Sequence, residues 1–283
     1  MKFYSPLRYP GGKAFLASEF GRIIQTIGLS KPIYVEPYAG GARTALSLLF
    51  ADKVEQIVIN DLDEAIYAFW KSVTEKSKQF AQKILATPVT MAEWKRQKQI
   101  YSDKSVNLFE KGFATFFLNR TNRSGVMNAG PIGGKKQAGS YKINARYNKK
   151  DLAARVRKIG EYKNRIKVLN EDGIQLTKRY LGKENTFIYL DPPYFKKGAM
   201  LYLNYYNETD HKELAGLLNK NADHHWVLTY DEVKKIRDLY PDRARIRLSL
   251  KCRVYDSSKV RRARELMFFS DSVLVPHSPA VLR

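Results

Sequence analysis

The chain has 283 residues, 44% of them hydrophobic, enough for one large α/β domain with an insertion or for two domains. Its formal net charge is +22, from 50 Lys and Arg against 28 Asp and Glu. No apolar run is long enough to span a membrane, and the N-terminal residues do not have the pattern of a signal peptide. A single cysteine, Cys252, excludes an internal disulfide and fits a reducing compartment, so we expect a cytoplasmic protein.

Basic residues are concentrated in two stretches of the chain. Residues 120–165 hold 13 Lys or Arg against 2 Asp or Glu, and residues 234–264 hold 12 against 3. Such clusters favour a polyanionic partner, and nucleic acid fits best because neither stretch has the clean amphipathic pattern of a membrane-surface helix. Four His and one Cys provide no metal-ligand spacing, so we expect no metal and no membrane partner.

Seven segments have the pattern of buried strands, and helical patterns separate most of them. The expected strands are Ile33–Glu36, Gln56–Asn60, Ile166–Asn170, Phe187–Leu190, Trp226–Thr229, Ile246–Leu250 and Leu266–Ser270. The expected helices include Ala42–Phe50, Asp63–Ser77, Thr209–Asn219 and Asp231–Leu239. This alternation predicts a mainly parallel, doubly wound sheet. Residues 62–165 do not follow it: they have helical patterns to about Leu118 and are then rich in turns, which indicates an inserted module.

Two glycine-containing segments near the N-terminus indicate a ligand site. Residues 6–13 read PLRYPGGK, and Lys13 at a helix start is electrostatically unfavourable unless it meets an anion such as a ligand carboxylate. The alternative is a solvated lysine in a surface loop. Residues 36–42 read EPYAGGA at a strand-to-helix turn, where the glycines allow close approach of a ligand. Their spacing matches neither a dinucleotide-binding motif nor a P-loop.

An acidic residue follows the second expected strand. Asp61 comes 21 residues after Gly40, where an acid can bind ribose hydroxyls. The alternative is that Asp61 caps the next helix, but Asp63 is an equally good cap.

The most specific motif is Asp191-Pro192-Pro193-Tyr194, which follows an apolar strand. The Asp191 carboxylate and the carbonyl of Pro192 are two acceptors for an amino group, and Tyr194 offers a flat face for stacking. This combination suits a planar base with an exocyclic amino group and predicts amino methylation of adenine or cytosine. The alternative is an ordinary turn after a strand.

Four blocks in this order resemble the Dam-type class of DNA adenine-N6 methyltransferases from about Leu7 to Ser270. They are P-x-x-Y-P-G-G-K, V-E-P-Y-A-G-G-A, I-N-D-L-D and, after the insertion, D-P-P-Y. The resemblance implies S-adenosylmethionine (AdoMet) as cofactor and a Rossmann-like methyltransferase fold with a seven-stranded, mainly parallel sheet. It also implies an AdoMet-binding catalytic domain of residues 1–61 and 166–283. Residues 62–165 would form an inserted, mostly helical domain that recognises the DNA target.

Residue by residue, the resemblance assigns a cofactor side and a base side. The expected cofactor contacts are Tyr9, Lys13 (toward the methionine part), Glu36, Pro37, Tyr38, Ala39, Gly40, Asp61 (ribose) and Asp172 (adenine). Asp191, Pro192, Pro193 and Tyr194 would hold the target base. Residues 228–231, which read LTYD, resemble a later block that lines the base pocket. The alternative for Tyr230 and Asp231 is a plain helix cap.

The insertion resembles the target-recognition region of the family. At the positions aligned with Arg123 and Ser124, members that methylate GATC carry an aromatic residue and Asn, so this chain departs from the pattern of those members. Arg123 and Gln137 would read base edges, and nearby lysines would contact phosphates. The full set of expected DNA contacts is Arg120, Asn122, Arg123, Ser124, Lys135, Lys136, Gln137, Lys142 and Arg146.

The expected reaction is a direct transfer of the AdoMet methyl group to the amino nitrogen of an adenine flipped out of double-stranded DNA. It needs no covalent intermediate and no metal, and we expect a monomer. The alternatives are methylation of cytosine N4 or of RNA adenine, and a non-catalytic DNA-binding module.

Overall fold

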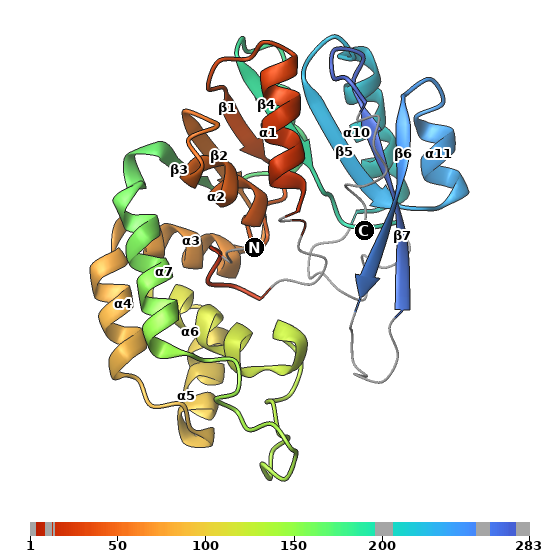
Figure 1. The fold of residues 1–283 in the computed structure, drawn as a ribbon. Coiled ribbons are helices and arrows are strands. Elements are labelled where there is room, and N and C mark those ends of the chain that lie inside the picture. The colour runs from red at the N-terminus through yellow and green to blue at the C-terminus, as the bar shows by residue number, and fades with distance from the viewer. Residues whose placement is uncertain (1–3, 9–12, 14, 196–205, 253–260, 276–283) are drawn as a thin grey trace. The chain divides into compact units, whose positions relative to one another are not determined.

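The computed structural model describes residues 4–8, 13, 15–195, 206–252 and 261–275 (Figure 1). The chain divides into two compact units. The helical unit comprises Met1–Gly12 and Asp63–Val168, and the sheet unit comprises Lys13–Leu62 and Leu169–Arg283. Tyr9, an expected cofactor contact, lies outside the described residues.

A seven-stranded sheet has the order β3-β2-β1-β4-β5-β7-β6. The strands are β1 (Ile33–Glu36), β2 (Gln56–Asn60), β3 (Ile166–Leu169), β4 (Thr186–Leu190), β5 (Trp226–Asp231), β6 (Arg245–Cys252) and β7 (Arg261–Phe269). Strands β2, β1, β4 and β5 pair in parallel, whereas β7 runs antiparallel to β5 and β6. The order reverses between β1 and β4, and in open α/β sheets ligands bind at such a switch point, beyond the carboxyl ends of the strands. The predicted α/β fold class is confirmed.

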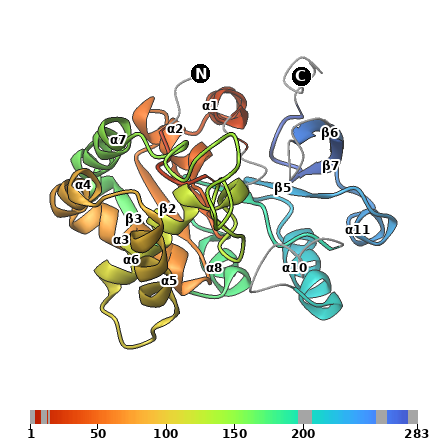
Figure 2. The same ribbon diagram turned by 90° about the horizontal axis from the view of Figure 1, so that it is seen from below.

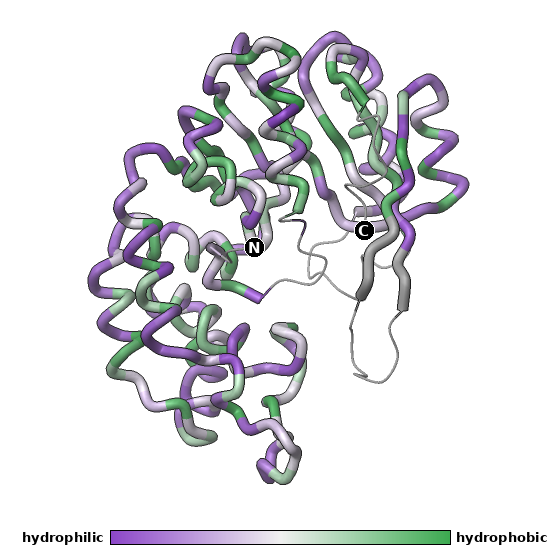
Figure 3. Tube along the Cα trace, viewed as in Figure 1, coloured by the Kyte–Doolittle hydropathy of each residue, from purple (hydrophilic) through white to green (hydrophobic). Residues whose placement is uncertain are grey.

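Helices cover both faces of this sheet (Figure 2). Helices α1 (Leu16–Thr26) and α2 (Arg43–Phe50) lie on one face, and α8 (Gly173–Tyr180), α10 (Glu208–Lys220) and α11 (Lys234–Leu239) lie on the other. Buried Val35, Ile188 and Leu228 of the central strands pack with Leu214 and Leu218 of α10. Hydrophobic residues gather along the central strands, whereas many of the turns are hydrophilic (Figure 3). Burial of this surface drives the sheet and its helices together.

The helical unit contains five α-helices in its described part. They are α3 (Glu64–Glu75), α4 (Ser77–Ala86), α5 (Met91–Ser102), α6 (Leu108–Thr121) and α7 (Lys149–Glu161). Helix α3 packs against α6, and α4 packs against α7. The rings of Phe69, Phe80, Phe113 and Phe116 form the centre of this packing. The Asp63 side chain caps α3 by accepting a hydrogen bond from the Ala65 amide, as its sequence position predicts.

The structure corrects two details of the expected elements. Tyr230 and Asp231 extend β5, where Asp231 pairs with Glu265 of β7, and α11 begins only at Lys234. Helix α7 occupies part of the segment expected to be rich in turns. Among the described residues, no helix combines the length and the apolar character that crossing a membrane requires.

Candidate active site

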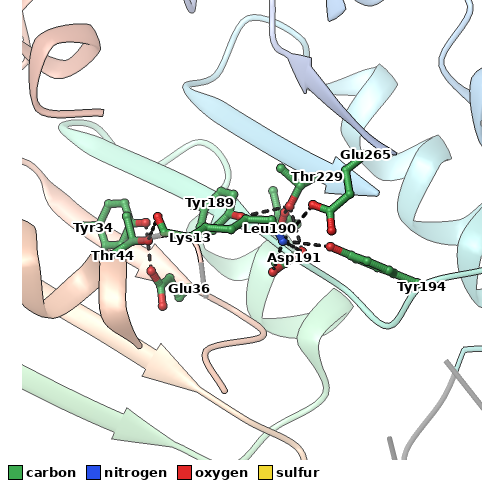
Figure 4. Close-up of polar contacts among 10 residues, drawn as sticks. All are labelled: Lys13, Tyr34, Glu36, Thr44, Tyr189, Leu190, Asp191, Tyr194, Thr229 and Glu265. Carbon is green, nitrogen blue, oxygen red and sulfur yellow. Dashed lines mark hydrogen bonds and ion pairs between the residues drawn. The ribbon is translucent and has the colours of Figure 1, made fainter. Parts of the chain in front are cut away.

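The motif lysine and the motif aspartate form an ion pair at the carboxyl end of β4 (Figure 4). Lys13, which precedes α1, places its ammonium nitrogen 2.8 Å from Oδ1 and 2.7 Å from Oδ2 of Asp191. The same nitrogen lies 2.8 Å from the hydroxyl oxygen of Tyr194. Lys13 was expected to meet a ligand carboxylate, but in this structure the protein itself supplies the anion. The Lys13 side chain is only 3% exposed, so solvent screens this pair very little.

Two residues from neighbouring strands complete this cluster. Thr229 of β5 donates a hydrogen bond of 2.8 Å to Asp191 Oδ1, and Glu265 of β7 places Oε2 3.2 Å from the Lys13 nitrogen. Burial acts to lower the pKa of Lys13, but Asp191 and Glu265 outweigh it, so the pKa is raised and the side chain is an ammonium. Thr229 belongs to the block expected to line the base pocket. Glu265 was not among the predicted site residues, and its sole signal is an acid preceding an apolar strand segment.

Asp191 keeps acceptor capacity after these contacts. Its Oδ1 accepts from Lys13 and Thr229, while Oδ2 accepts from Lys13. A carboxylate offers about four lone-pair sites, so Oδ2 can accept a further N–H. The Asp191 side chain is 28% exposed, and Tyr194 beside it is half-buried. The motif can therefore present an acceptor to a polar group from outside the protein.

Phe195, the residue directly after the motif, is held by β5. Asp231 Oδ1 accepts a hydrogen bond of 3.0 Å from the Phe195 amide. The Tyr230 hydroxyl forms a 2.8 Å hydrogen bond with Nδ1 of His211 in α10. Since Val233 occupies the N-cap position of α11, the helix-cap interpretation of Tyr230 and Asp231 is wrong. Asp231 instead holds the backbone directly after Tyr194.

The glycine-containing turn after β1 is held by buried polar groups. Glu36 Oε1 accepts hydrogen bonds of 3.0 Å from the Tyr34 hydroxyl and from the Ala45 amide. Burial raises the pKa of Glu36 to about 8, despite these two hydrogen bonds, so the carboxyl is protonated at neutral pH. Gly40 has a φ of 45° and donates its amide to Asp61 Oδ2 at 2.9 Å. Asp61 therefore anchors this turn.

Tyr38 of this turn lies beside the start of α8, because a Cβ added to Gly173 would meet its ring. The Tyr38 hydroxyl forms a 2.6 Å hydrogen bond with the Tyr206 hydroxyl, and burial raises the pKa of Tyr38 well above its usual range. Asp172 Oδ1 caps α8 by accepting from the amides of Ile174 and Gln175. The Pro37 carbonyl oxygen accepts a hydrogen bond of 2.8 Å from Asn60 Nδ2. Buried Ala39 donates its amide to the Asn60 carbonyl.

This edge of the sheet fits the cofactor that the sequence blocks imply. The ends of β1, β2 and β3 bring together a tight glycine turn, carboxylates and a tyrosine. Carboxylates suit hydroxyl and amino groups, and the aromatic ring suits a nucleoside base. Among the described residues, no group of three or more His, Cys, Asp or Glu could hold a metal ion.

In the helical unit, three of the expected DNA contacts serve the fold. Asn122 is fully buried: its Oδ1 accepts from Trp94 Nε1 at 2.7 Å, and its Nδ2 donates to two backbone carbonyls. Gln137 donates Nε2 to two carbonyls of its own loop and accepts from the Ile143 amide. The Arg120 Nε donates to the Pro6 carbonyl. These amides and this guanidinium satisfy backbone groups that have no partner within a helix or a sheet.

The other expected DNA contacts surround the same loop. Ser124 is half-buried with a φ of 55°, within the short 3₁₀ turn Arg123–Gly125. The exposed basic residues of this loop are Arg123, Lys135, Lys136, Lys142 and Arg146. The Arg146 guanidinium lies over the ring of Tyr141, which is 67% exposed. The loop therefore presents cations together with an aromatic ring.

Comparison with known protein families gives a match over most of the chain. The family model of D12 class N6 adenine-specific DNA methyltransferases matches residues 9–253. Among curated proteins, none matches this chain in sequence. A solved structure from Pyrococcus horikoshii, assigned provisionally as an RNA methyltransferase, is 11% identical with a TM-score of 0.42 and covers 94% of this chain and 87% of its own. The rRNA methyltransferase AviRa from Streptomyces viridochromogenes is 15% identical with a TM-score of 0.40 and covers 94% and 88%.

These solved structures are distant likenesses, and the assignment rests on the family model. The match spans most of the chain, including the glycines of both N-terminal segments and the motif at Asp191. The chain belongs to the D12 class of AdoMet-dependent, N6 adenine-specific DNA methyltransferases.

Proposed function

We propose that this protein methylates N6 of an adenine that has left the stack of double-stranded DNA, at a short recognition sequence. The observation that carries the proposal is the state of Asp191. Its carboxylate is partly exposed, oriented by Lys13 and Thr229, and retains acceptor capacity at Oδ2.

In the proposed reaction, the residues of the motif orient the amino group. Asp191 Oδ2 and the Pro192 carbonyl accept its two N–H bonds, and the ring of Tyr194 stacks on the base. The nitrogen lone pair is then directed toward the methyl donor, which is what AdoMet supplies when bound. The negative charge of Asp191 stabilises the positive charge that grows on the nitrogen, so catalysis comes from positioning and electrostatics. Asp191 accepts the proton after transfer and passes it to solvent.

The cofactor side of the proposal uses the turns after β1, β2 and β3. Asp61, held against Gly40, binds the ribose hydroxyls, and Tyr38 and Asp172 border the adenine. Glu36 supports this turn from within the protein, since its carboxyl is buried. Because Lys13 is bonded to Asp191, we assign the methionine part of AdoMet to the turn of residues 37–40 instead.

We propose a division of labour between the two units. The sheet unit binds AdoMet and carries out the transfer, and the helical unit recognises DNA through its exposed basic loop. Arg123 reads a base edge, and Lys135, Lys136, Lys142 and Arg146 contact phosphates. Asn122, Gln137 and Arg120 shape this loop from inside. The proposal includes a monomer in the cytoplasm.

Nucleoside analysis tests this proposal against its alternatives. The protein is incubated with labelled AdoMet and either unmethylated DNA or RNA, and the products are digested and separated. Label in N6-methyldeoxyadenosine is the expected result. Label in N4-methyldeoxycytidine or in RNA adenosine would show that the substrate is cytosine or RNA instead. No label, despite AdoMet binding, would support the non-catalytic alternative.

A further inference from the structure

Among the described residues that contact Lys13, Glu265 of β7 is a carboxylate that no sequence motif includes. We infer that Glu265 is a positioning residue for methyl transfer: it holds Lys13 against Asp191 and Tyr194 and keeps the net charge of the site negative. The inference rests on the proposed function for its catalytic consequence, and its contact with Lys13 is testable independently of activity.

The contacts of Lys13 show how Glu265 acts. The hydrogen bonds of the ammonium go to both oxygens of Asp191 and to the Tyr194 hydroxyl. Glu265 Oε2 lies 3.2 Å from the same nitrogen and forms an ion pair with it. Glu265 therefore attracts Lys13 by its charge, and it also shares a hydrogen bond with Tyr194. It therefore acts on Lys13, which is bonded to Asp191, and on Tyr194, which is bonded to Lys13.

Burying Glu265 costs free energy, so a purely structural role does not explain its position. The residue is 3% exposed, beside the apolar segment Leu266–Phe269. Buried carboxylates lose hydration, and an apolar side chain at such a position is often equally stable or more so. The ion pair with Lys13 offsets part of the desolvation of Glu265. A role in holding Lys13 in place therefore explains the buried acid better than a role in stability alone.

The charges at the site show why Glu265 should increase the rate of methyl transfer. Asp191 and Lys13 cancel, so these two residues alone would present a neutral site to the reacting nitrogen. Glu265 restores one negative charge within a buried environment. During transfer, positive charge passes from the donor toward the amino nitrogen, and a fixed negative charge nearby stabilises it. Loss of Glu265 should therefore reduce kcat more than cofactor binding.

Several ionisable groups surround Glu265 and set its titration. Lys13 and Asp191 face it, Tyr194 and Tyr189 lie nearby, and Asp231 is its cross-strand neighbour on β5. Burial raises the pKa of Glu265; Lys13 opposes this rise and Asp191 adds to it. As pH rises through this raised pKa, the carboxyl ionises and kcat should increase.

The first test compares Glu265→Gln with Glu232→Gln. Glu232 forms an ion pair with the exposed Arg247 and serves as the control, because its substitution removes the same charge away from Lys13. We expect Glu265→Gln to lower kcat at least tenfold and to change the Kd of AdoMet less than threefold. In a plot of kcat against pH, the fall of kcat at low pH (the acid limb) should disappear in this variant. Unchanged kcat, or an acid limb that persists in the variant, would overturn the inference.

A second variant covers the case in which Glu265→Gln does not fold. Glu265→Asp keeps the charge on a shorter side chain, so it should retain the acid limb with a smaller loss of kcat. Loss of the limb in Glu265→Asp would count against the role of charge.

A measurement on Lys13 separates this inference from the proposed function. In protein labelled with ¹⁵N-lysine, the Lys13 ammonium signal is identified by its absence in Lys13→Arg. We expect Glu265→Gln to shift this signal and to lower its pKa, whereas Glu232→Gln should leave both unchanged. An unchanged Lys13 signal would overturn the inference. If the wild-type protein methylates no DNA, the proposed function fails, but this measurement still decides whether Glu265 positions Lys13.

Discussion

Lys13 and Asp191 form an ion pair at 2.7 Å although they are 178 residues apart in the chain. One belongs to the segment before the first helix of the sheet unit, and the other to the turn after β4. The pairing joins the two most distinctive sequence motifs into one cluster. It also explains how a lysine can be buried at this place, because its charge is balanced by the Asp191 carboxylate.

We expect Glu36 to make stability depend on pH. Its carboxyl has a pKa of about 8 in the folded protein, whereas an unperturbed glutamate has a pKa of 4.5. Between these values the folded state binds more protons, so its contribution to stability is complete below pH 4.5 and is lost as pH rises through 8. Glu36→Gln, which can accept the same hydrogen bonds, should gain stability relative to wild type across this range, by an amount on the order of a few kcal/mol.

Denaturant unfolding at pH 5, 7 and 9 measures this difference. Glu64→Gln, at an exposed glutamate in the first turn of α3, is the control. A difference between Glu36→Gln and wild type that stays constant with pH would contradict the raised pKa.

Gly173→Ala should weaken AdoMet binding. A Cβ at this position would lie 2.8 Å from the Tyr38 hydroxyl and closer still to its ring, so the ring must move and its hydrogen bond with Tyr206 is lost. We expect the Kd for AdoMet to rise at least tenfold in calorimetry. Gly216→Ala in α10, where a Cβ meets nothing within 4 Å, should leave binding unchanged and add up to about 1 kcal/mol of stability. Equal Kd values for the two variants would exclude Tyr38 from the cofactor site.

Asn122→Ala should destabilise the protein. The substitution leaves the buried Trp94 Nε1 and two carbonyls without their partner, at a cost of roughly 2–4 kcal/mol. Exposed Asn128→Ala is the matched control and should change the free energy of unfolding by less than about 0.5 kcal/mol. If Asn122→Ala had normal stability but bound DNA more weakly, Asn122 would instead contact DNA directly.

Replacing Lys135 and Lys136 by Gln should weaken DNA binding on all sequences alike. Each phosphate contact contributes about 0.9 to the slope of log K against log salt, so the double variant should reduce this slope by roughly 2. Replacement of Lys212 and Lys234, which pair with Glu208 and Asp238, removes the same charge elsewhere and is the control. Fluorescence anisotropy at several salt concentrations measures both. An equal slope in wild type and the Lys135/Lys136 variant would remove this loop from the interface.

The strands of this fold were largely predictable from the sequence. Apolar segments such as Ile33–Glu36 and Gln56–Asn60 are bounded by turn residues, and the structure gives these same limits. Asp231 was misassigned because an acid after an apolar run looks like a helix cap, whereas pairing with β7 extends the strand. Local pattern carries no information on such a partner.

Polar residues in the recognition segment were harder to interpret for a different reason. Asn122 and Gln137 lie among glycines and turns, where backbone groups need partners that a helix or a sheet would otherwise supply. An amide that serves the backbone and an amide that reads a base look the same in one sequence. Glu265 was missed because its partner Lys13 is distant in the chain and only the folded sheet brings them together.

The most direct test of the central claim compares wild type with Asp191→Ala on unmethylated plasmid DNA, read by single-molecule sequencing for N6-methyladenine. Asp238→Ala, at an exposed ion pair of α11, is the control. Asp191→Ala also leaves Lys13 with Glu265 as its remaining counterion, so we expect a loss of roughly 1–3 kcal/mol of stability, and the assay is run well below its unfolding temperature. We predict modified adenines in one short motif for wild type and control, and none for Asp191→Ala despite retained AdoMet binding. Substantial methylation by folded Asp191→Ala would contradict the role assigned to this carboxylate.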